Sequence, residues 1–189
     1  MGETGAILVV DDDPAICVVV SEALRRQGHR VKTATSIRER GELLESFAPD
    51  ILVTDVMLPD GDGLDEVADI MARVPGLNVI VLSAQNTLNT AIRATEKGAF
   101  EYLPKPFDLN ELTRAVAEAL GTKEEATGFA EPGLPHDGLP LVGRSPAMQE
   151  VYRTVARVLS NDLSILVLGE SGTGKELVAE AIHSLGRRR

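Results

Sequence analysis

Apolar and polar positions follow a repeating order along the first 120 residues. Five short apolar runs are each followed by a longer segment whose apolar residues have helical spacing. These runs are residues 6–10, 30–35, 51–54, 78–83 and 100–103. Several of the runs are continuously apolar, which is typical of strands covered on both faces. The repeated strand–helix units predict an α/β fold with a doubly wound, five-stranded parallel sheet.

Local signals mark the ends of several helices. Asp13 and Pro14 are typical of an N-cap and a first helical turn, and Gly28 is expected to end that helix. Asp108 is expected to cap the helix after the last apolar run. The apolar stripe of the first helix is expected to comprise Ile16, Val19, Val20, Ala23 and Leu24.

The strand–helix pattern stops at residues 121–140, where glycine and proline predict a linker. Ser145 and Pro146 then predict the start of a helix. Residues 163–168 predict a sixth buried strand. The apolar face of the new helix is expected to comprise Met148, Val151, Val155 and Val158 or Leu159. The predicted organisation is one domain at 5–120, a linker at 121–140 and the beginning of a second domain at 141–189.

The composition limits the classes of function. The chain of 189 residues has a net charge of −10, most of it within residues 1–120, and neither part has the basic surface of a nucleic-acid binder. No apolar run approaches the ~20 residues that span a bilayer, and no signal-peptide pattern is present. The single cysteine, Cys17, fits a reducing compartment and a buried structural thiol. We therefore expect a cytoplasmic protein without a membrane partner.

Polar residues follow four of the predicted strands. In a doubly wound sheet, ligands bind beyond the carboxyl ends of the strands. Crowded carboxylates repel each other, and oxygen ligands of this kind suit Mg²⁺, beside which a carboxylate can attack a phosphoryl group. Taken singly, each residue has an ordinary alternative as a helix cap, a turn residue or a solvated lysine. The residues expected at this edge are Asp11, Asp12, Asp13, Asp55, Ser83 and Lys105.

Four motifs in this part resemble the response-regulator receiver domain of two-component signalling. The motifs are "VVDDDP", "VTDVMLPDGDGL", "VLSAQ" and "FEYLPKPF", and the resemblance covers about residues 5–120. It implies that Asp55 accepts a phosphoryl group from a sensor histidine kinase. It also implies that Mg²⁺ is held by Asp11, Asp12, Asp55 and the backbone carbonyl of Met57.

The same resemblance implies roles for three further residues. Ser83 would be the switch hydroxyl, where threonine is also frequent in the family, and Lys105 would pair with the phosphoryl group. Tyr102 would be the aromatic residue that turns inward on activation, with a tyrosine packed on the surface of the edge strand as the alternative. The peptide bond between Lys105 and Pro106 is expected to be cis, which is essentially a proline feature.

The segment "GESGTGKE" at 169–176 nearly fits the phosphate-binding loop pattern. Glycines let backbone N–H groups face the phosphates, and Lys175 would reach the β and γ oxygens. Glu176 departs from the usual serine or threonine, so an ordinary glycine turn is the alternative. The predicted nucleotide-binding residues are Gly169, Glu170, Ser171, Gly172, Thr173, Gly174, Lys175 and Glu176.

The segments "LVGRSPAMQEVYRTVARVL" and "LVLGESGTGKELVAEAIH" resemble the start of the AAA+ ATPase domain of sigma-54-dependent activators, in which glutamate stands at the position of Glu176. The order of receiver, linker and this domain resembles the NtrC family of nitrogen regulation, with NtrX-like and dicarboxylate-transport regulators as alternatives. This implies a phosphorylation-dependent regulator that controls sigma-54-dependent transcription, with genes of nitrogen assimilation as the expected targets. Its implied partners are a sensor kinase, a second copy and, for the full-length protein, DNA, sigma-54 RNA polymerase and ATP.

The chain contains only the first part of the ATPase apparatus. A Walker B acidic pair, an arginine finger and a DNA-reading helix-turn-helix are not found in it, and phosphoryl-transfer catalysis relies on positioned metal ligands and a charge-stabilising arginine. We therefore expect an N-terminal fragment that acts as a regulatory phospho-acceptor rather than as an enzyme. Two alternatives are a P-loop enzyme with an acidic scaffold domain, and a stand-alone receiver with a small appendage.

Overall fold

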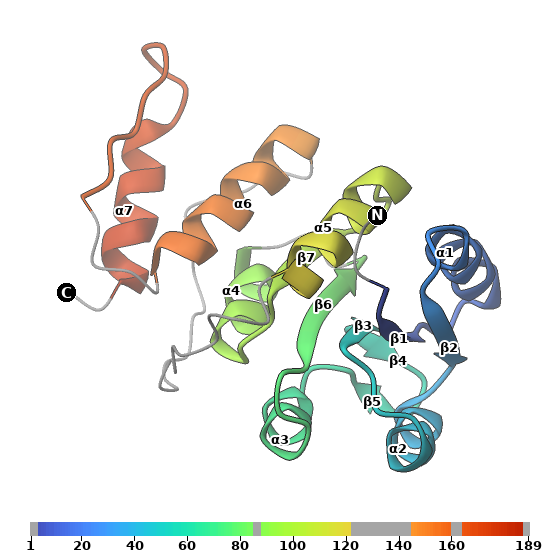
Figure 1. Ribbon diagram of the computed structural model, residues 1–189. Coiled ribbons are helices and arrows are strands. Elements are labelled where there is room, and N and C mark those ends of the chain that lie inside the picture. Colours follow the sequence, from blue (N-terminus) through green and yellow to red (C-terminus); the bar gives the residue numbers. More distant parts are fainter. Residues whose placement is uncertain (1–3, 85–87, 122–144, 160–163, 187–189) are drawn as a thin grey trace.

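A five-stranded parallel sheet runs through the first part of the chain (Figure 1). The computed structural model describes residues 4–84, 88–121, 145–159 and 164–186. The strand order in the sheet is β2-β1-β3-β6-β7. The strands are β1 (Ala6–Val10), β2 (Arg30–Ala34), β3 (Ile51–Asp55), β6 (Asn78–Ser83) and β7 (Glu101–Pro104). The predicted fold class is confirmed, because each predicted apolar run forms one of these parallel strands.

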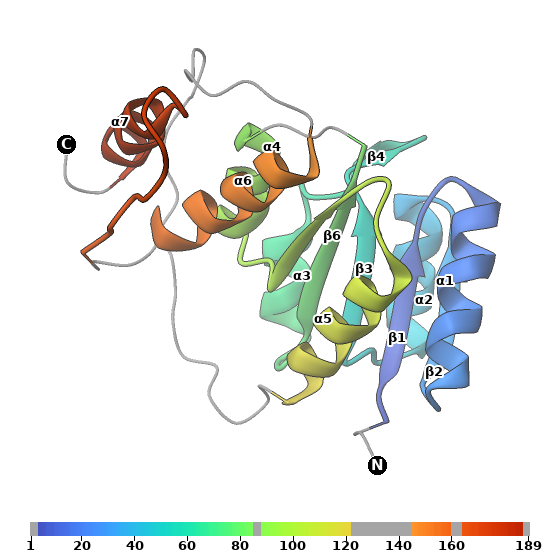
Figure 2. The same ribbon diagram turned by 90° about the horizontal axis from the view of Figure 1, so that it is seen from above.

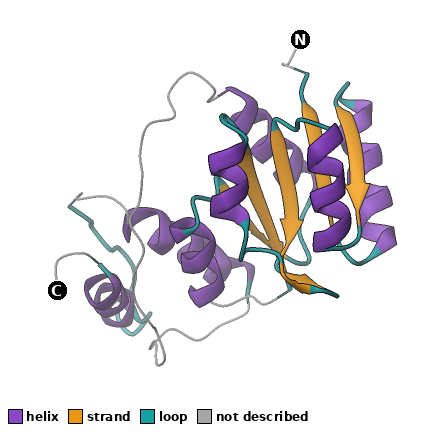
Figure 3. Ribbon diagram, turned by 90° about the horizontal axis from the view of Figure 1, so that it is seen from below, coloured by secondary structure: helices purple, strands orange, loops and turns teal. Residues whose placement is uncertain are grey.

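Helices cover both faces of the sheet (Figures 1 and 3). Successive strand residues point to opposite faces, so Ile7 and Val9 belong to one apolar core, and Leu8 and Val10 belong to the other. The helices α1 (Pro14–Arg26) and α5 (Leu109–Gly121) contribute to the first core. The second core is covered by α2 (Ile37–Ser46), α3 (Val67–Arg73) and α4 (Leu88–Glu96).

The predicted cap residues are confirmed at two helix starts. The Asp13 carboxylate accepts a hydrogen bond from the N–H of Ala15 at 2.8 Å, and the Asp108 carboxylate accepts one from the N–H of Asn110 at 2.8 Å. After α1, Gly28 adopts a left-handed φ of 93° that disfavours side chains. These local interactions fix the points at which the chain leaves the edges of the sheet.

The predicted stripe of α1 was wrong at Val19, whose residue is 50% exposed. The buried face instead contains Cys17, Val20, Ser21 and Leu24. Almost every residue from 16 to 20 is apolar, so hydrophobicity alone does not define the rotation of the helix there. Contact with the sheet decides which side of α1 is buried.

The segment after β3 contains an antiparallel ribbon that the sequence did not predict. It pairs β4 (Met57–Leu58) with β5 (Gly61–Asp62), and the next helix begins at Val67. The fully buried side chain of Arg40 in α2 holds this segment. Its guanidinium group donates to the Gly63 carbonyl oxygen at 2.9 Å and to Glu66 at 2.8 Å.

Two further helices, α6 (Pro146–Leu159) and α7 (Lys175–Leu185), follow the residues that resemble a linker. The N–H of Met148 donates to the Ser145 hydroxyl at 3.3 Å, as the predicted helix start requires. Helix α6 lies beside α4, and α7 lies farther from the sheet (Figures 1 and 2). None of the helices in the described ranges is long and apolar enough to cross a membrane.

The sixth buried strand was a wrong prediction for residues 164–168. This segment forms no strand, and Leu166 and Leu168 are 80% and 81% exposed. A strand requires a neighbour for its backbone hydrogen bonds, and no described residue pairs with this segment. Residue 163 and most of the predicted linker, residues 122–140, lie outside the described residues.

Gly63 provides a test of the packing behind β3. A Cβ atom there would lie 1.9 Å from the Asp55 carbonyl oxygen, whereas a Cβ atom at Gly41 in α2 would meet nothing within 4 Å. We expect Gly63→Ala to lower the free energy of unfolding by roughly 1–3 kcal/mol. Gly41→Ala should raise it by up to ~1 kcal/mol, because alanine favours helix. Urea unfolding of both variants checks this, and an unchanged Gly63→Ala midpoint would contradict the packing.

Candidate functional site

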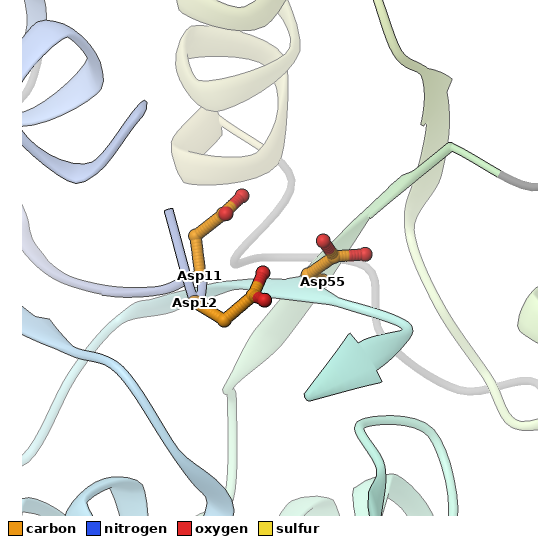
Figure 4. Close-up of side chains that lie close together, drawn as sticks. All are labelled: Asp11, Asp12 and Asp55. Atoms are coloured by element: carbon orange, nitrogen blue, oxygen red, sulfur yellow. The ribbon is translucent and has the colours of Figure 1, made fainter. Parts of the chain in front are cut away.

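Three carboxylates meet at the carboxyl edge of the sheet (Figure 4). Asp11 and Asp12 follow β1, and Asp55 ends the neighbouring strand β3. One oxygen atom from each of the three carboxylates lies within 4.8 Å of the others. Asp11 and Asp55 are buried and Asp12 is exposed, so the acidic group is reached from the side of Asp12.

Lys105 brings a cation into this acidic group. Its Nζ atom lies 2.7 Å from Asp11 Oδ2 and 2.5 Å from Asp55 Oδ2. Burial acts to lower the pKa of Lys105, but the hydrogen bonds to Asp11 and Asp55 outweigh burial and raise it. The backbone N–H of Lys105 donates to the Ser83 carbonyl oxygen at 2.7 Å, and the bond to Pro106 is cis as expected. The Lys105 side chain is therefore charged, and its ammonium group is held between Asp11 and Asp55.

Burial dominates the electrostatics of Asp11, whose residue has no exposed surface. Desolvation raises the pKa of Asp11, and the hydrogen bonds from Lys105 and from the N–H of Asp13 offset it only in part. The ionised form of Asp11 therefore costs folding free energy in the chain alone. A carboxylate in this position gains from any further positive charge placed beside it.

The residues around Asp55 hold its carboxylate in place. The N–H of Met57 donates to Asp55 Oδ1 at 3.2 Å, while the Met57 residue is 54% exposed. The N–H of Gly63 donates to the Val56 carbonyl oxygen at 2.7 Å, which folds the following segment back against β3. Asp55 Oδ2 is thus the oxygen that faces Lys105.

Ser83 and Tyr102 form a second, buried part of the site. Ser83 has no exposed surface, Tyr102 is 4% exposed, and their side chains are joined by a hydrogen bond. Burial raises the pKa of Tyr102 to about 12, although Ser83 and the positive charge of Arg153 act in the opposite direction. Tyr102 also lines a small cavity with Arg153 and Ala156 of α6, so that helix contributes to the burial of its ring.

Asp13 and Cys17 border the site without joining the acidic group. The Asp13 carboxylate caps α1 instead, which was the ordinary alternative for this residue. Cys17 is buried, and its thiol donates to the Asp11 carbonyl oxygen at 3.3 Å. Burial also raises the pKa of the Cys17 thiol, so it is a structural residue as expected.

Two arginines that position the segment after Asp55 were missed from the sequence. Arg40 holds Gly63 and Glu66, and Arg93 in α4 pairs with Asp62 at 2.7 Å. No local signal separates these arginines from solvated ones, because the partners of both lie in the loop after β3. Their role depends on which turn of the helix faces the loop.

The glycine-rich segment forms a loop at the start of α7, apart from the acidic group (Figures 1 and 2). Gly172 and Gly174 have left-handed φ values of 81° and 85°, and Gly174 is the N-cap. Lys175 Nζ donates to the carbonyl oxygens of Gly169 and Glu170 at 2.7 and 2.5 Å. The Thr173 hydroxyl donates to the Glu170 carbonyl oxygen. Ser171 and Glu176 are exposed.

Two family matches agree with this division of the chain. Residues 7–117 match the response regulator receiver domain, and residues 141–189 match the sigma-54 interaction domain. The chain therefore belongs to the response regulator receiver family and also carries part of a sigma-54 interaction domain. The resemblance drawn from the sequence motifs is confirmed at this level.

Three similar proteins illustrate these matches. The DNA-binding transcriptional regulator NtrC of Azospirillum brasilense is 50% identical over 184 residues, which cover 97% of this chain and 38% of that protein. The structure of NtrX from Brucella abortus with ATP has a TM-score of 0.61 and 32% identity, covering 98% of this chain and 41% of that one. A beryllofluoride-activated NtrC4 receiver domain dimer has a TM-score of 0.60 and 32% identity, covering 63% of this chain and 98% of that one.

The buried charge of Asp11 leads to a pH-dependent prediction. Because the pKa of Asp11 is raised in the folded chain, the folded state binds the carboxyl proton more tightly than the unfolded state does. The free energy of unfolding therefore falls as the pH rises through the folded-state pKa. In EDTA at about pH 7.5, Asp11→Asn should therefore raise the free energy of unfolding by on the order of 1 kcal/mol, because it removes the cost of burying this charge while Asp55 still pairs with Lys105. The gain should shrink at about pH 4.5, as urea unfolding at both pH values will measure.

The matched control for this change is Asp12→Asn, which neutralises the exposed neighbour. It should alter stability less than Asp11→Asn at the higher pH. A loss of stability in Asp11→Asn would mean that the ion pair with Lys105 outweighs the cost of burial.

Proposed function

We propose that Asp55 accepts a phosphoryl group from a sensor histidine kinase and thereby regulates sigma-54-dependent transcription. One observation carries this proposal. Lys105 Nζ lies 2.5 Å from Asp55 Oδ2 at the carboxyl edge of a receiver sheet. A cation beside the acceptor oxygen can neutralise the negative charge that a phosphoryl group adds.

The residues beside Asp55 fit Mg²⁺ as a cofactor. Oxygens of Asp11, Asp12 and Asp55 lie together, and Mg²⁺ prefers a few carboxylate oxygens completed by water and phosphate. The buried Asp11 carboxylate would gain from the cation, since burial raises its pKa. Met57 would add its carbonyl oxygen, as the family resemblance implies. When bound, the ion would offset the charge of the phosphoryl donor.

In the proposed transfer, an Asp55 carboxylate oxygen attacks the phosphorus atom of a phosphohistidine. A P–O bond forms, the P–N bond breaks, and its electron pair remains on the histidine nitrogen. The Met57 N–H, 3.2 Å from Asp55 Oδ1, orients the carboxylate during this step. Lys105 pairs with the phosphoryl oxygens, and the Ser83 hydroxyl donates a hydrogen bond to one of them. The receiver has a regulatory role here, as phospho-acceptor.

For the whole protein, we propose a regulator of the NtrC kind. The chain spans 38% of the length of its curated NtrC relative, so activities beyond the receiver rest on the similarity. Identity of 50% to NtrC, against 32% to NtrX, favours an NtrC-like regulator of nitrogen assimilation genes over the NtrX-like alternative. Such a regulator acts in the cytoplasm, where the DNA is.

The proposed partners of the whole protein follow the same similarity. The NtrX structure holds ATP, the NtrC relative is a DNA-binding protein, and the NtrC4 receiver is a dimer. We therefore assign ATP to residues 169–176, with backbone N–H groups and Lys175 as phosphate ligands. Lys175 would exchange its bonds to the Gly169 and Glu170 carbonyl oxygens for bonds to phosphate. A second copy, DNA and sigma-54 RNA polymerase complete the set.

Asp55→Asn tests the acceptor directly. With Mg²⁺ and acetyl phosphate, the parent chain should gain the mass of one phosphoryl group, and Asp55→Asn should gain none. Asp65→Asn is the matched control, because Asp65 is an exposed aspartate of the same loop that pairs with Arg93. Intact-mass spectrometry measures all three, and equal uptake by Asp55→Asn and the parent would refute the assignment.

Asp12→Ala tests the proposed metal ligands. It should weaken Mg²⁺ binding, measured by calorimetry, by more than about tenfold while the fold is retained. The matched control is Asp13→Ala, which should keep the parental affinity but lose ~1 kcal/mol of stability with the helix cap. Parental Mg²⁺ affinity in Asp12→Ala would show that the wrong ligand was named.

A further inference from the structure

The acceptor loop, residues 56–66 between β3 and α3, is tied to α2 at two points (Figure 1). At the turn of the β4–β5 ribbon, the Asp60 carboxylate accepts hydrogen bonds from two backbone N–H groups at the start of α2, at 2.8 and 2.9 Å. Where the loop returns to β3, the Arg40 guanidinium group donates to the Gly63 carbonyl oxygen and to Glu66. The beginning of α2 therefore holds both the tip and the return of this loop.

Stability alone does not account for an arginine at position 40. The Arg40 side chain has no exposed surface, whereas the side chain of its ion-pair partner Glu66 is 54% exposed. The Arg40 Nε atom is buried and has no hydrogen-bond partner among the described residues. Burying a charge with incomplete pairing costs free energy, and an apolar side chain of similar volume is often neutral or stabilising in its place.

A short series of hydrogen bonds connects Arg40 to the acceptor carboxylate. Arg40 binds the Gly63 carbonyl oxygen, and the N–H of Gly63 donates to the Val56 carbonyl oxygen at 2.7 Å. The Val56 carbonyl group belongs to the same peptide unit as the Met57 N–H, which donates to Asp55 Oδ1 at 3.2 Å. Arg40 therefore holds one end of a series whose other end orients the acceptor.

The planarity of the peptide unit makes this connection direct. The carbonyl and N–H groups of one unit lie in a common plane, so a hydrogen bond to the Val56 carbonyl oxygen also limits rotation of the Met57 N–H. The backbone at Gly63 lies so close to β3 that a Cβ atom there would be 1.9 Å from the Asp55 carbonyl oxygen. Met57 is 54% exposed, so burial of its side chain does not fix the peptide unit.

We propose that Arg40 is a positioning residue that sets the orientation of the peptide unit before Met57 and thereby shapes the site for Mg²⁺ and the phosphoryl group. This inference rests on the proposed function, which assigns the Met57 N–H to the orientation of Asp55 and the Met57 carbonyl oxygen to Mg²⁺. The hydrogen bonds of Arg40 go to Gly63 and Glu66, so Arg40 acts through the backbone rather than on the reacting atoms.

The first measurement is amide hydrogen exchange in EDTA, which reports on the loop without metal. The test variant Arg40→Met keeps a side chain of similar length and removes its hydrogen bonds. Exchange of the Gly63 N–H should become faster by about tenfold or more, because the loop opens locally. Exchange of the Val56 N–H, which donates to the Leu82 carbonyl oxygen in β6, should stay unchanged. The free energy of unfolding should be unchanged or higher, because a buried charge is removed.

The second measurement is the affinity for Mg²⁺ alone, determined by calorimetry. Arg40→Met should bind Mg²⁺ about tenfold more weakly than the parent, because residues that support metal ligands affect affinity on this scale. Loss of a nearby positive charge would by itself tighten Mg²⁺ binding, so the direction of the change separates positioning from charge.

Two further variants complete the comparison. Arg38→Met is the matched control, because it makes the same change in the same helix at a side chain that is 83% exposed. Its Gly63 exchange and Mg²⁺ affinity should stay close to those of the parent. Arg40→Lys should give values between those of the parent and Arg40→Met, because an ammonium group reproduces the two-armed contact of the guanidinium group only in part. It carries the same comparison if Arg40→Met does not fold.

The outcomes separate the positioning role from the proposed function. Unchanged Gly63 exchange in Arg40→Met, or Mg²⁺ binding as tight as in the parent, would overturn the positioning role. A lower free energy of unfolding with parental Mg²⁺ affinity would show that Arg40 only stabilises the fold, and an equal loss of affinity in Arg38→Met would rule out the hydrogen bonds as the cause. If the parent chain itself neither binds Mg²⁺ nor takes up phosphate, the proposed function fails and the positioning role falls with it.

Discussion

The ammonium group of Lys105 between Asp11 and Asp55 is the interaction on which the site depends. Without it, two buried carboxylates would face each other across neighbouring strands with no opposing charge among the described side chains beside them. The lysine can reach this position because its backbone N–H is bonded to the end of β6. The order of the strands therefore decides which side chains meet at this edge, and Lys105 balances the charge of the carboxylates that meet there.

The strands and the acidic group follow closely from the sequence. Buried parallel strands need continuous apolar runs, and the carboxyl ends of such strands meet at one edge. This is why Asp11, Asp12, Asp55 and Lys105 lie together as expected. Asp13 was expected both at this edge and as a helix cap, and it caps the helix, because a carboxylate before a helix has free N–H groups close by.

The remaining features depend on contacts between distant segments. The β4–β5 ribbon and the buried Arg40 require α2 and the loop after β3 to meet, which no local pattern records. Residues 164–168 have the composition of a strand but no neighbour to pair with among the described residues. Helix α6 makes contacts on two sides, and the sequence predicted only the apolar one. The second side was missed because it uses arginines that resemble solvated residues.

A helix that packs on both sides has consequences for how such regulators exchange domains. The substitutions tolerated at Tyr152, Arg153, Ala156 and Arg157 are limited by the receiver, although these residues lie in the other family match. A sigma-54 domain joined to a foreign receiver would keep the ion pairs of Arg153 and Arg157 only if that receiver placed acidic side chains at the positions of Glu111 and Glu101. The segment that has to be exchanged together with the receiver therefore extends past the linker into α6.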